Sequence, residues 1–334
     1  MTLRRRDTLK LAGAAVAAST VGTAGCLDAV GFGDDGYDRW LAARDEGVAF
    51  AYADVAEIDD LEEDVSPDGG GTDPDDPLLA IPRGGAVLVG LAANVALAGT
   101  GLDALVSLDD DEADDAYDST VEGLLVTGAI VLEGQFDVEE VDELLGTADG
   151  LFERRYERTD ELGDYDLYRP ADDGLGDGAV VVSDEVVVQV FDDDPEAVVE
   201  EALDAAAGDA ERAADAFDGF GWALETAGEG QLVVGAFGED PETEGEVAPG
   251  SEDAPDPDEA IEGVDGADGF VCSLSADAEA RETVAEFAGI FSGLDDGTEA
   301  DLEAVLGASA TETSVEIEDG RVTATATWRD EGTE

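Results

Sequence analysis

Apolar residues alternate with polar ones, or gather in short β-rich runs, along most of the chain after residue 46. Runs of this kind, bounded by Gly, Pro, Asp and Ser, predict strands. The predicted strands are 47–53, 121–136, 152–158, 165–169, 179–182, 186–191, 231–237, 270–274, 314–318 and 321–328. Asp319-Gly320 is the strongest short-range hairpin signal among their connections, and residues 183–185 and 163–164 predict two more hairpins.

Four other segments have helical spacing of their apolar residues. Asp137 and Glu140 match a capping box, so a helix is expected from Asp137 to about Ala148. Asp192 to Pro195 begins a second helix, with Pro at its first position. A third is expected within residues 209–226. A fourth is expected after Ser275, where helical spacing relates Val284, Phe287, Ala288 and Phe291.

Hairpins outnumber plausible parallel crossovers, which favours antiparallel sheets with helices on one face, an α+β fold. The order strand, capped helix, hairpin occurs in residues 127–169 and again in residues 270–328, so two related units are expected. Residues 239–262 are rich in Pro, Gly and acids and predict a loop between a main domain, 41–238, and a second unit, 263–330. This arrangement is similar to uncharacterised exported proteins built from such repeats, a similarity that implies no activity.

The most apolar part of the chain after the first 26 residues is the segment from Ala86 to Leu108. It is long enough to span a membrane. However, three glycines interrupt it, and Asp109 to Asp111 follow where a basic flank is usual. A buried helix or helix pair packed on a sheet explains its small residues better and is the favoured interpretation.

The first 26 residues have the order of a signal peptide. A basic stretch that includes Arg5, Arg6 and Lys10 precedes an uncharged run rich in Ala and Val, and small residues stand directly before Cys26. Arg5-Arg6-x-x-Leu9-Lys10 resembles the twin-arginine export signal, and Thr23-Ala24-Gly25-Cys26 resembles the lipobox of lipoproteins.

This resemblance implies cleavage after residue 25, lipid on Cys26, and a folded protein that crosses the membrane through the export machinery. The expected localisation is the outer side of the cell membrane, where the lipid is the membrane partner. Residues 26–40 are then a flexible tether. The resemblance covers the leader only.

Composition indicates the solvent. The chain has 87 acidic residues against 15 basic ones, and removing the leader leaves 86 acids against 11 arginines, a net charge near −75. Such repulsion opposes compaction at low salt but is screened in molar salt, where the Debye length is about 3 Å. The composition resembles that of proteins from salt-loving archaea. Nucleic acid is not expected as a partner, because phosphate binding needs clustered basic residues that this chain lacks.

The residue inventory restricts the chemistry. The chain has no histidine, which excludes Ser-His-Asp and Cys-His nucleophile sites and His-containing zinc sites. With Cys26 lipidated, Cys272 has no disulfide partner. No stretch matches the EF-hand loop, and paired catalytic carboxylates cannot be recognised among so many acids. No metal, cofactor or catalytic residue is predicted.

A few residues are weak candidates for a site. Arg154, Arg155 and Arg158 could bind an anionic ligand bidentately, although local compensation of the surrounding acids is the favoured interpretation. Asp109 to Asp111 and Asp192 to Asp194 could bind Ca²⁺ or Mg²⁺, but a solvated acidic surface explains both. Phe220 and Trp222 are expected in the core, as is Cys272.

Three hypotheses of function follow. The favoured one is a lipid-anchored cell-envelope interaction or structural module without enzymatic activity, whose partner is an envelope protein. The alternative is a lipoprotein that binds a solute or small ligand, although the two large βα-rich lobes usual in that class are not predicted. A carboxylate- or metal-dependent hydrolase is the third and least favoured hypothesis.

Overall fold

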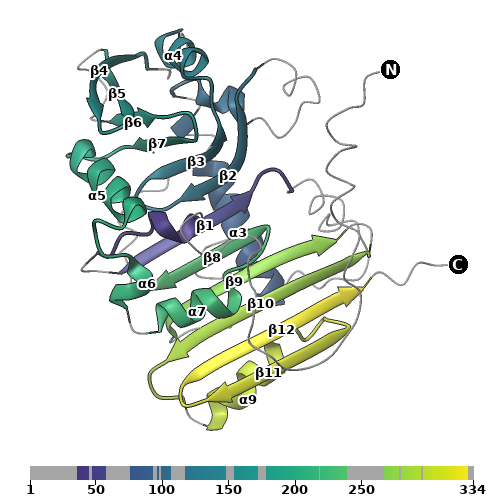
Figure 1. Ribbon diagram of the computed structural model, residues 1–334. Helices are drawn as coiled ribbons and strands as arrows, with labels where there is room; N and C mark the ends of the chain where they lie inside the picture. Colours follow the sequence, from purple (N-terminus) through teal and green to yellow (C-terminus); the bar gives the residue numbers. More distant parts are fainter. Residues whose placement is uncertain are drawn as a thin grey trace, which may run out of the picture. The chain divides into compact units, whose positions relative to one another are not determined.

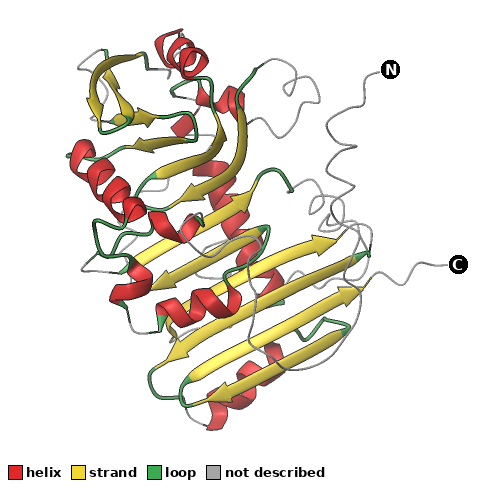
Figure 2. Ribbon diagram, in the orientation of Figure 1, coloured by secondary structure: helices red, strands yellow, loops and turns green. Residues whose placement is uncertain are grey.

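The computed structural model describes residues 36–44, 47–57, 76–92, 96–97, 99–106, 117–147, 154–171, 178–217, 219–238, 267–277, 280–294 and 296–329. Residues 31–334 form one compact unit. Its described part is a mixed structure in which one large antiparallel sheet carries helices (Figures 1 and 2). The α+β class expected from the sequence is therefore confirmed.

Twelve strands form the sheet in the described part of the chain. In chain order they are β1 (Val48–Asp54), β2 (Thr120–Val126), β3 (Ile130–Gln135), β4 (Tyr156–Leu162), β5 (Tyr165–Pro170), β6 (Ala179–Val182), β7 (Val186–Val190), β8 (Leu232–Phe237), β9 (Ala267–Asp277), β10 (Glu282–Phe291), β11 (Glu312–Glu318) and β12 (Arg321–Arg329).

Their order across the sheet is β11-β12-β10-β9-β8-β1-β2-β3-β7-β6-β5-β4. Strands β1 to β3 form a meander, and β4 to β7 form a second meander whose last strand returns to pair with β3. Strands β8 to β10 form a third meander, and β12 returns to pair with β10. The sheet thus has one half made of β1 to β7 and another made of β8 to β12. The antiparallel pair β1–β8 joins the two halves, with Ala51 opposite Val234.

Helices pack on both faces of the sheet. One face, called the α3 face here, carries α3 (Pro77–Ala92), the 3-10 helix η3 (Leu102–Leu105), α4 (Val138–Thr147) and α9 (Asp296–Val305). The other, the α5 face, carries the 3-10 helix η1 (Tyr37–Trp40), α5 (Pro195–Ala207), α6 (Ala213–Ala216) and α7 (Phe220–Ala227).

The prediction that helices would cover one face is thus not confirmed. The physical reason lies in the central strands, whose side chains are apolar on both sides. All nine residues of β6 and β7 are buried: Val180, Val182 and Val187 face the α3 side, and Val181 and Val188 face the α5 side. Strands of this kind need cover on two faces.

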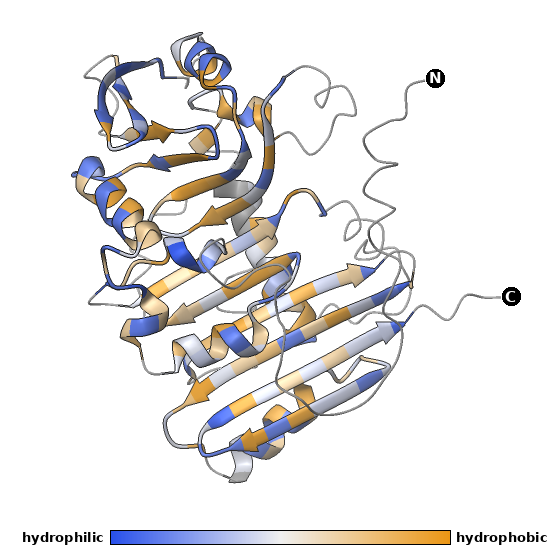
Figure 3. Cartoon of the chain, in the orientation of Figure 1, coloured by the Kyte–Doolittle hydropathy of each residue, from blue (hydrophilic) through white to orange (hydrophobic). Residues whose placement is uncertain are grey.

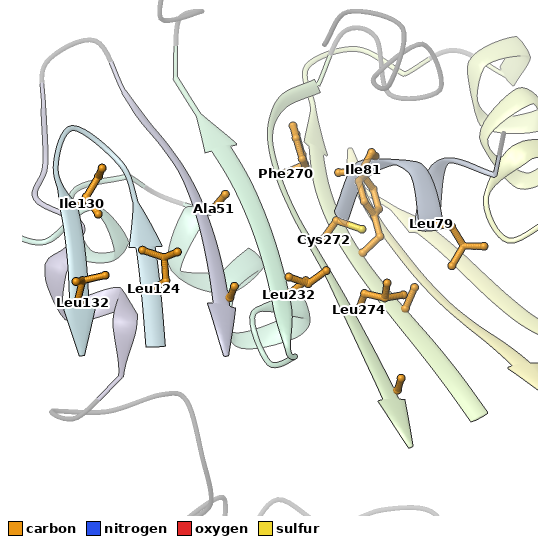
Figure 4. Packing of buried hydrophobic residues seen from close by; sticks show 14 of the residues in the cluster. Ala51, Leu79, Ile81, Leu124, Ile130, Leu132, Leu232, Phe270, Cys272 and Leu274 are labelled. Carbon is orange, nitrogen blue, oxygen red and sulfur yellow. The ribbon is translucent and has the colours of Figure 1, made fainter. Parts of the chain in front are cut away.

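The core on the α3 face is continuous along the sheet. Leu79 and Ile81 of α3 pack with Cys272 and Leu274 of β9 in the same buried cluster (Figure 4). At Gly85 of α3, a Cβ atom would lie 2.0 Å from a Cγ atom of Val234. Glycine therefore sets the close approach of α3 to β8, because any side chain there would overlap the sheet.

A buried carboxylate connects the start of α3 with the segment after α9. Asp76 is 4% exposed and precedes Pro77, the first residue of the helix. Its Oδ1 accepts hydrogen bonds from the backbone N of Leu78 (3.2 Å) and of Gly307 (3.1 Å). Its Oδ2 accepts hydrogen bonds from the backbone N and the Oγ of Ser309, at 2.9 and 2.8 Å. Asp76 therefore both caps α3 and links segments that are far apart in the chain.

Part of the apolar segment from Ala86 to Leu108 packs in the core, although Val87 is 54% exposed. The described part of this segment comprises the end of α3, residues 96–97, and residues 99–106, which include η3. Leu97 and Leu102 are buried in the α3-face cluster. Gln189 of β7 donates to the carbonyl of Ala96 at 3.0 Å, which ties the segment to the sheet. No helix among the described residues has both the length and the apolarity needed to cross a bilayer.

Several local predictions agree with the structure. The run 121–136 is the hairpin of β2 and β3, which turns near Gly128, and one predicted helix is wrong. The hairpins at residues 163–164, 183–185 and 319–320 are present, as are the helices that begin after Asp137 and Asp194. The helix expected after Ser275 is instead strand β10. Its residues Thr283, Ala285, Phe287 and Phe291 alternate toward the α3 face, and Ala288 is buried on the α5 face. Burial on both sides produced apolar spacing that a helix would also have.

The 3-10 helix η1 and the strands on either side of residues 239–262 are packed parts of the fold. Tyr37 and Trp40 of η1 are buried. Trp40 Nε1 and Arg39 Nη2 each donate to Glu133 Oε1 at 2.8 Å, which fastens η1 to the sheet. Strands β8 and β9, on either side of residues 239–262, pair directly within one compact unit.

Candidate functional site

The predicted export and lipidation residues lie outside the described part of the chain. These are Arg5, Arg6, Leu9, Lys10 and Cys26. The same holds for Asp109 to Asp111. Asp192 to Asp194 are exposed and form the turn before α5, where Asp192 Oδ1 accepts a hydrogen bond from the backbone N of Asp194 at 3.0 Å. Among the described residues no group of three or more His, Cys, Asp or Glu side chains is arranged to hold a metal ion.

The three clustered arginines have different surroundings. Arg158 forms ion pairs with Glu161, at 2.9 Å, and with Asp166. The Arg154 guanidinium lies over the Phe191 ring, 5.7 Å from its centroid, and its backbone N donates to the carbonyl of Gly99. Arg155 is exposed. Arg158 thus compensates neighbouring carboxylates, and Arg154 packs on an aromatic ring.

The candidate core residues are buried or half-buried. Cys272 has no exposed surface, and its burial, followed by the charge of Asp76, raises the pKa of the thiol. A thiol of this kind stays protonated at neutral pH and is a poor nucleophile. Phe220 is fully buried, whereas Trp222 is half-buried at the margin of α7.

A larger feature is the α5 face of β12 and its neighbours, where α7 covers only part of the strands. In β12 the side chains of Val322, Ala324, Ala326 and Trp328 are buried on the α3 face, and the alternate residues are half-buried or exposed. Figure 1 shows α7 in front of β9 and β10, and α9 behind β11 and β12. We call this surface the open face; it comprises Ser314 and Glu316 of β11, Thr323, Thr325 and Thr327 of β12, and Glu286 of β10.

The register orders the side chains of the open face into rows across the strands. Ser314, Thr325 and Glu286 lie opposite one another in one row, and Glu316 and Thr323 belong to the next. Figure 3 shows β12 in the pale colours of intermediate hydropathy with hydrophilic ends. The open face therefore presents hydroxyl groups between charged residues, spaced as the strands dictate.

Charged groups at both ends of β12 are held in place. Arg329 forms ion pairs with Glu282 Oε2 (2.7 Å) on one side and Glu312 Oε2 (3.0 Å) on the other. At the other end, the Arg321 guanidinium lies 4.6 Å from the centroid of the Trp222 ring. Such stacking restricts an otherwise flexible side chain.

Glu286 is the partly buried acid of the open face. Burial, and then the charge of Glu229, raises the pKa of its carboxyl group. The open face thus combines threonine and serine hydroxyl groups, which donate and accept hydrogen bonds, with carboxylate acceptors.

Part of the open face could be predicted from the sequence. Alternation of Val322, Ala324 and Ala326 with Thr323, Thr325 and Thr327 is visible in the sequence and predicts one buried and one polar side. The contribution of β10 was missed because that segment was expected to be a helix.

Comparison with known proteins yields no relative: no family model, no curated protein and no solved structure matches the chain.

Proposed function

We propose that this protein is a lipid-anchored interaction module on the outer side of the cell membrane, and that it works by binding another envelope protein without catalysing a reaction. The twin-arginine-like leader and the lipobox-like Thr23-Ala24-Gly25-Cys26 support the location. The open face is the observation that carries the binding function, because its polar side chains are ordered into rows by the strand register, beyond the part of the α5 face that α7 covers.

The chemistry of the open face supports a polar, reversible contact. The hydroxyl groups of Thr323, Thr325 and Thr327 lie between two fixed arginines, Arg321 and Arg329. Interfaces of proteins that associate and dissociate are about as polar as the rest of a protein surface, and arginine is enriched in them. The side chains of the open face meet that description better than they meet that of an obligate apolar interface.

A photo-activated cross-linking residue at position 325, in the full chain expressed in its native envelope, tests the proposal. The control carries the same residue at Glu200, which is exposed on α5. A discrete adduct at position 325 and none at position 200 is expected. A stoichiometric small molecule released from the purified protein, with no adduct at position 325, would instead support a solute-binding lipoprotein.

We further propose that the module consists of two related strand-helix-hairpin units. Outward from the β1–β8 pair, the strand orders β1-β2-β3-β7 and β8-β9-β10-β12 correspond, and α4 and α9 follow the third strand of each. The two helices also place matching side chains in the α3-face cluster. Val141 and Leu145 of α4 correspond to Leu302 of α9 and to Leu306, which directly follows α9, and each set precedes a glycine.

An exchange of segments tests this second proposal. Replacing residues 298–307 with the sequence of residues 137–146 keeps both buried positions apolar and the final glycine in place. A loss of about 1 kcal/mol in unfolding free energy is expected, because Leu302 becomes valine and loses one buried methylene group while Leu306 stays leucine. Failure to fold would contradict the correspondence.

A further inference from the structure

The two outer strands of the sheet, β4 and β11, differ in regularity. Strand β4 has a register shift between Arg158 and Asp160. Four of its seven residues are charged, and Thr159 lies between them. Bulges and charges of this kind protect a sheet edge against further pairing. Strand β11 pairs with β12 over seven consecutive residues without a shift. It is the regular edge of the sheet.

The turn that closes β11 and β12 determines which backbone groups of β11 face outward. Asp319 and Gly320 both have positive φ, 52° and 81°, as a two-residue type I′ turn requires. Glu318 and Arg321 are therefore a hydrogen-bonded pair, and hydrogen-bonded pairs recur at every second residue. The backbone groups of Thr313, Val315 and Ile317 consequently point away from β12. Within the described residues, no strand pairs with them.

Side chains give this edge two distinct sides. Val315 and Ile317 are half-buried and pack against the α3-face cluster. Ser314, Glu316 and Glu318 are exposed on the side of the open face. A strand that added to this edge would continue both surfaces, so it needs apolar residues on one side and polar residues on the other.

The inner neighbour of β11 indicates which polar residues match it. Glu312 is paired with Arg329, Ser314 lies opposite Thr325, and Glu318 lies opposite Arg321. An antiparallel strand with basic ends and hydroxyl residues between them therefore complements β11. A second copy does not, because antiparallel pairing centred on Val315 would place Glu312 opposite Glu318.

We propose that the edge of β11 binds an extended segment of a partner protein by antiparallel β-pairing. The segment has alternating apolar residues on the α3 side, and hydroxyl and basic residues on the side of the open face. This inference rests on the proposed binding function and assigns it a site and a partner chemistry. Main-chain hydrogen bonds supply affinity in this binding mode, and the alternate side chains supply specificity.

A synthetic peptide with the sequence of residues 321–329 is the probe, because it reproduces the strand that β11 already accepts. Its binding to the full chain, in detergent and molar KCl, is measured by fluorescence anisotropy. Val315→Pro removes an N–H group that points away from β12 and leaves every donor to β12 in place. Proline is tolerated at such positions of an edge strand. We expect at least a tenfold loss of affinity in this variant, with a melting temperature that confirms folding.

Changes in the peptide provide a test that leaves the protein intact. N-methylation of alternate residues blocks one edge of the peptide, so one of the two alternate sets should abolish binding and the other should preserve it. Glu200→Gln, at an exposed position on α5 away from β11, should leave peptide affinity unchanged.

Three results would overturn the proposal: no binding at millimolar peptide, equal binding by Val315→Pro, or equal effects of both methylation sets. A dimer of the chain that Val315→Pro abolishes would also overturn it, in favour of a second copy. An adduct at position 325 together with any of these results would leave the interaction module intact and remove only the edge site.

Discussion

Among the acidic residues that the structure describes, Asp76 is the one whose loss we expect to destabilise the fold most. Replacement by alanine removes the acceptor for the backbone N–H groups of Gly307 and Ser309 and for the Ser309 hydroxyl, while these donors stay buried or half-buried. It also removes the side-chain cap of α3 at Leu78. Ser309 Oγ accepts a hydrogen bond from Trp328 Nε1 at 3.0 Å, so the disturbance reaches β12.

The magnitude follows from the number of donors left without an acceptor. Hydrogen bonds to charged groups contribute about 1.5–3 kcal/mol each, and their sum is reduced because the donors belong to one network. We therefore expect Asp76→Ala to lower the unfolding free energy by about 3–5 kcal/mol, the range for breaking a buried charged network. At about 2–4 °C per kcal/mol, the melting temperature should fall by about 6–20 °C.

Urea unfolding at constant molar KCl, followed by circular dichroism, measures this difference without altering the ionic strength. Asp137→Ala is the matched control: Asp137 Oδ1 caps α4 at the backbone N of Glu139 (2.9 Å) and Glu140 (3.3 Å), in exposed positions. Its loss should cost about 0.5–2 kcal/mol, as for other helix caps. If Asp76→Ala costs no more than Asp137→Ala, the link between α3 and the segment after α9 does not stabilise the protein.

Three further predictions concern the anchor, the solvent and pH. Cys26→Ser should move the protein from the membrane to the soluble fraction, and unchanged membrane partition would refute lipid anchoring. Dilution from molar salt to about 0.1 M lengthens the Debye length from about 3 to about 10 Å, so the melting temperature should fall; an unchanged value would contradict the charge argument. The pKa of Glu286 is raised in the folded protein, so protonation of its carboxyl group stabilises the fold. This stabilisation is fully present below the pKa of glutamate in the unfolded chain, about 4.3, and is lost as pH rises through the pKa of Glu286 in the folded protein. Glu286→Gln should therefore raise the melting temperature at pH 7 but not below about pH 4, whereas Glu316→Gln, at an exposed position, should have little effect at either pH.

Elements with strong local signals were predictable from the sequence. Asp319-Gly320 supplies the two positive φ values of its turn, and Asp137 accepts hydrogen bonds from the first turn of α4. In both cases the residues that determine the structure are adjacent in the chain. The capping box was only half formed, because Glu140 accepts hydrogen bonds from the backbone N of Asp118 and Ser119 instead of that of Asp137.

Elements defined by tertiary burial were less predictable. Strand β10 has apolar residues on both sides, so Val284, Phe287, Ala288 and Phe291 have a spacing that fits a helix as well as a strand. The continuous valines of β6 and β7 indicate strands that are covered on two faces. This pattern is visible in the sequence, and it argues against the prediction that all helices lie on one face.

The candidate binding surface could be located only once the order of the strands in the sheet was known. The alternation in β12 predicts a polar side, but only the pairing of β12 with β10 places that side next to Glu286 and leaves β11 at the edge. Strands β4 and β11 both begin hairpins and are similar in length, and the sequence does not indicate that either one is outermost. The register shift after Arg158 distinguishes them in the structure.

The solvent that the composition predicts also bears on how such a protein recognises a partner. In molar salt, attraction between exposed charges extends over about 3 Å, so long-range steering by the acidic surface is largely lost. Main-chain hydrogen bonds and apolar contacts act at contact distance and are spared. A regular edge such as β11, with Val315 and Ile317 on one side, therefore suits a protein of this charge better than an ionic surface does. The carboxylates of Glu312, Glu316 and Glu318 then select among partner strands only once pairing has brought them into contact.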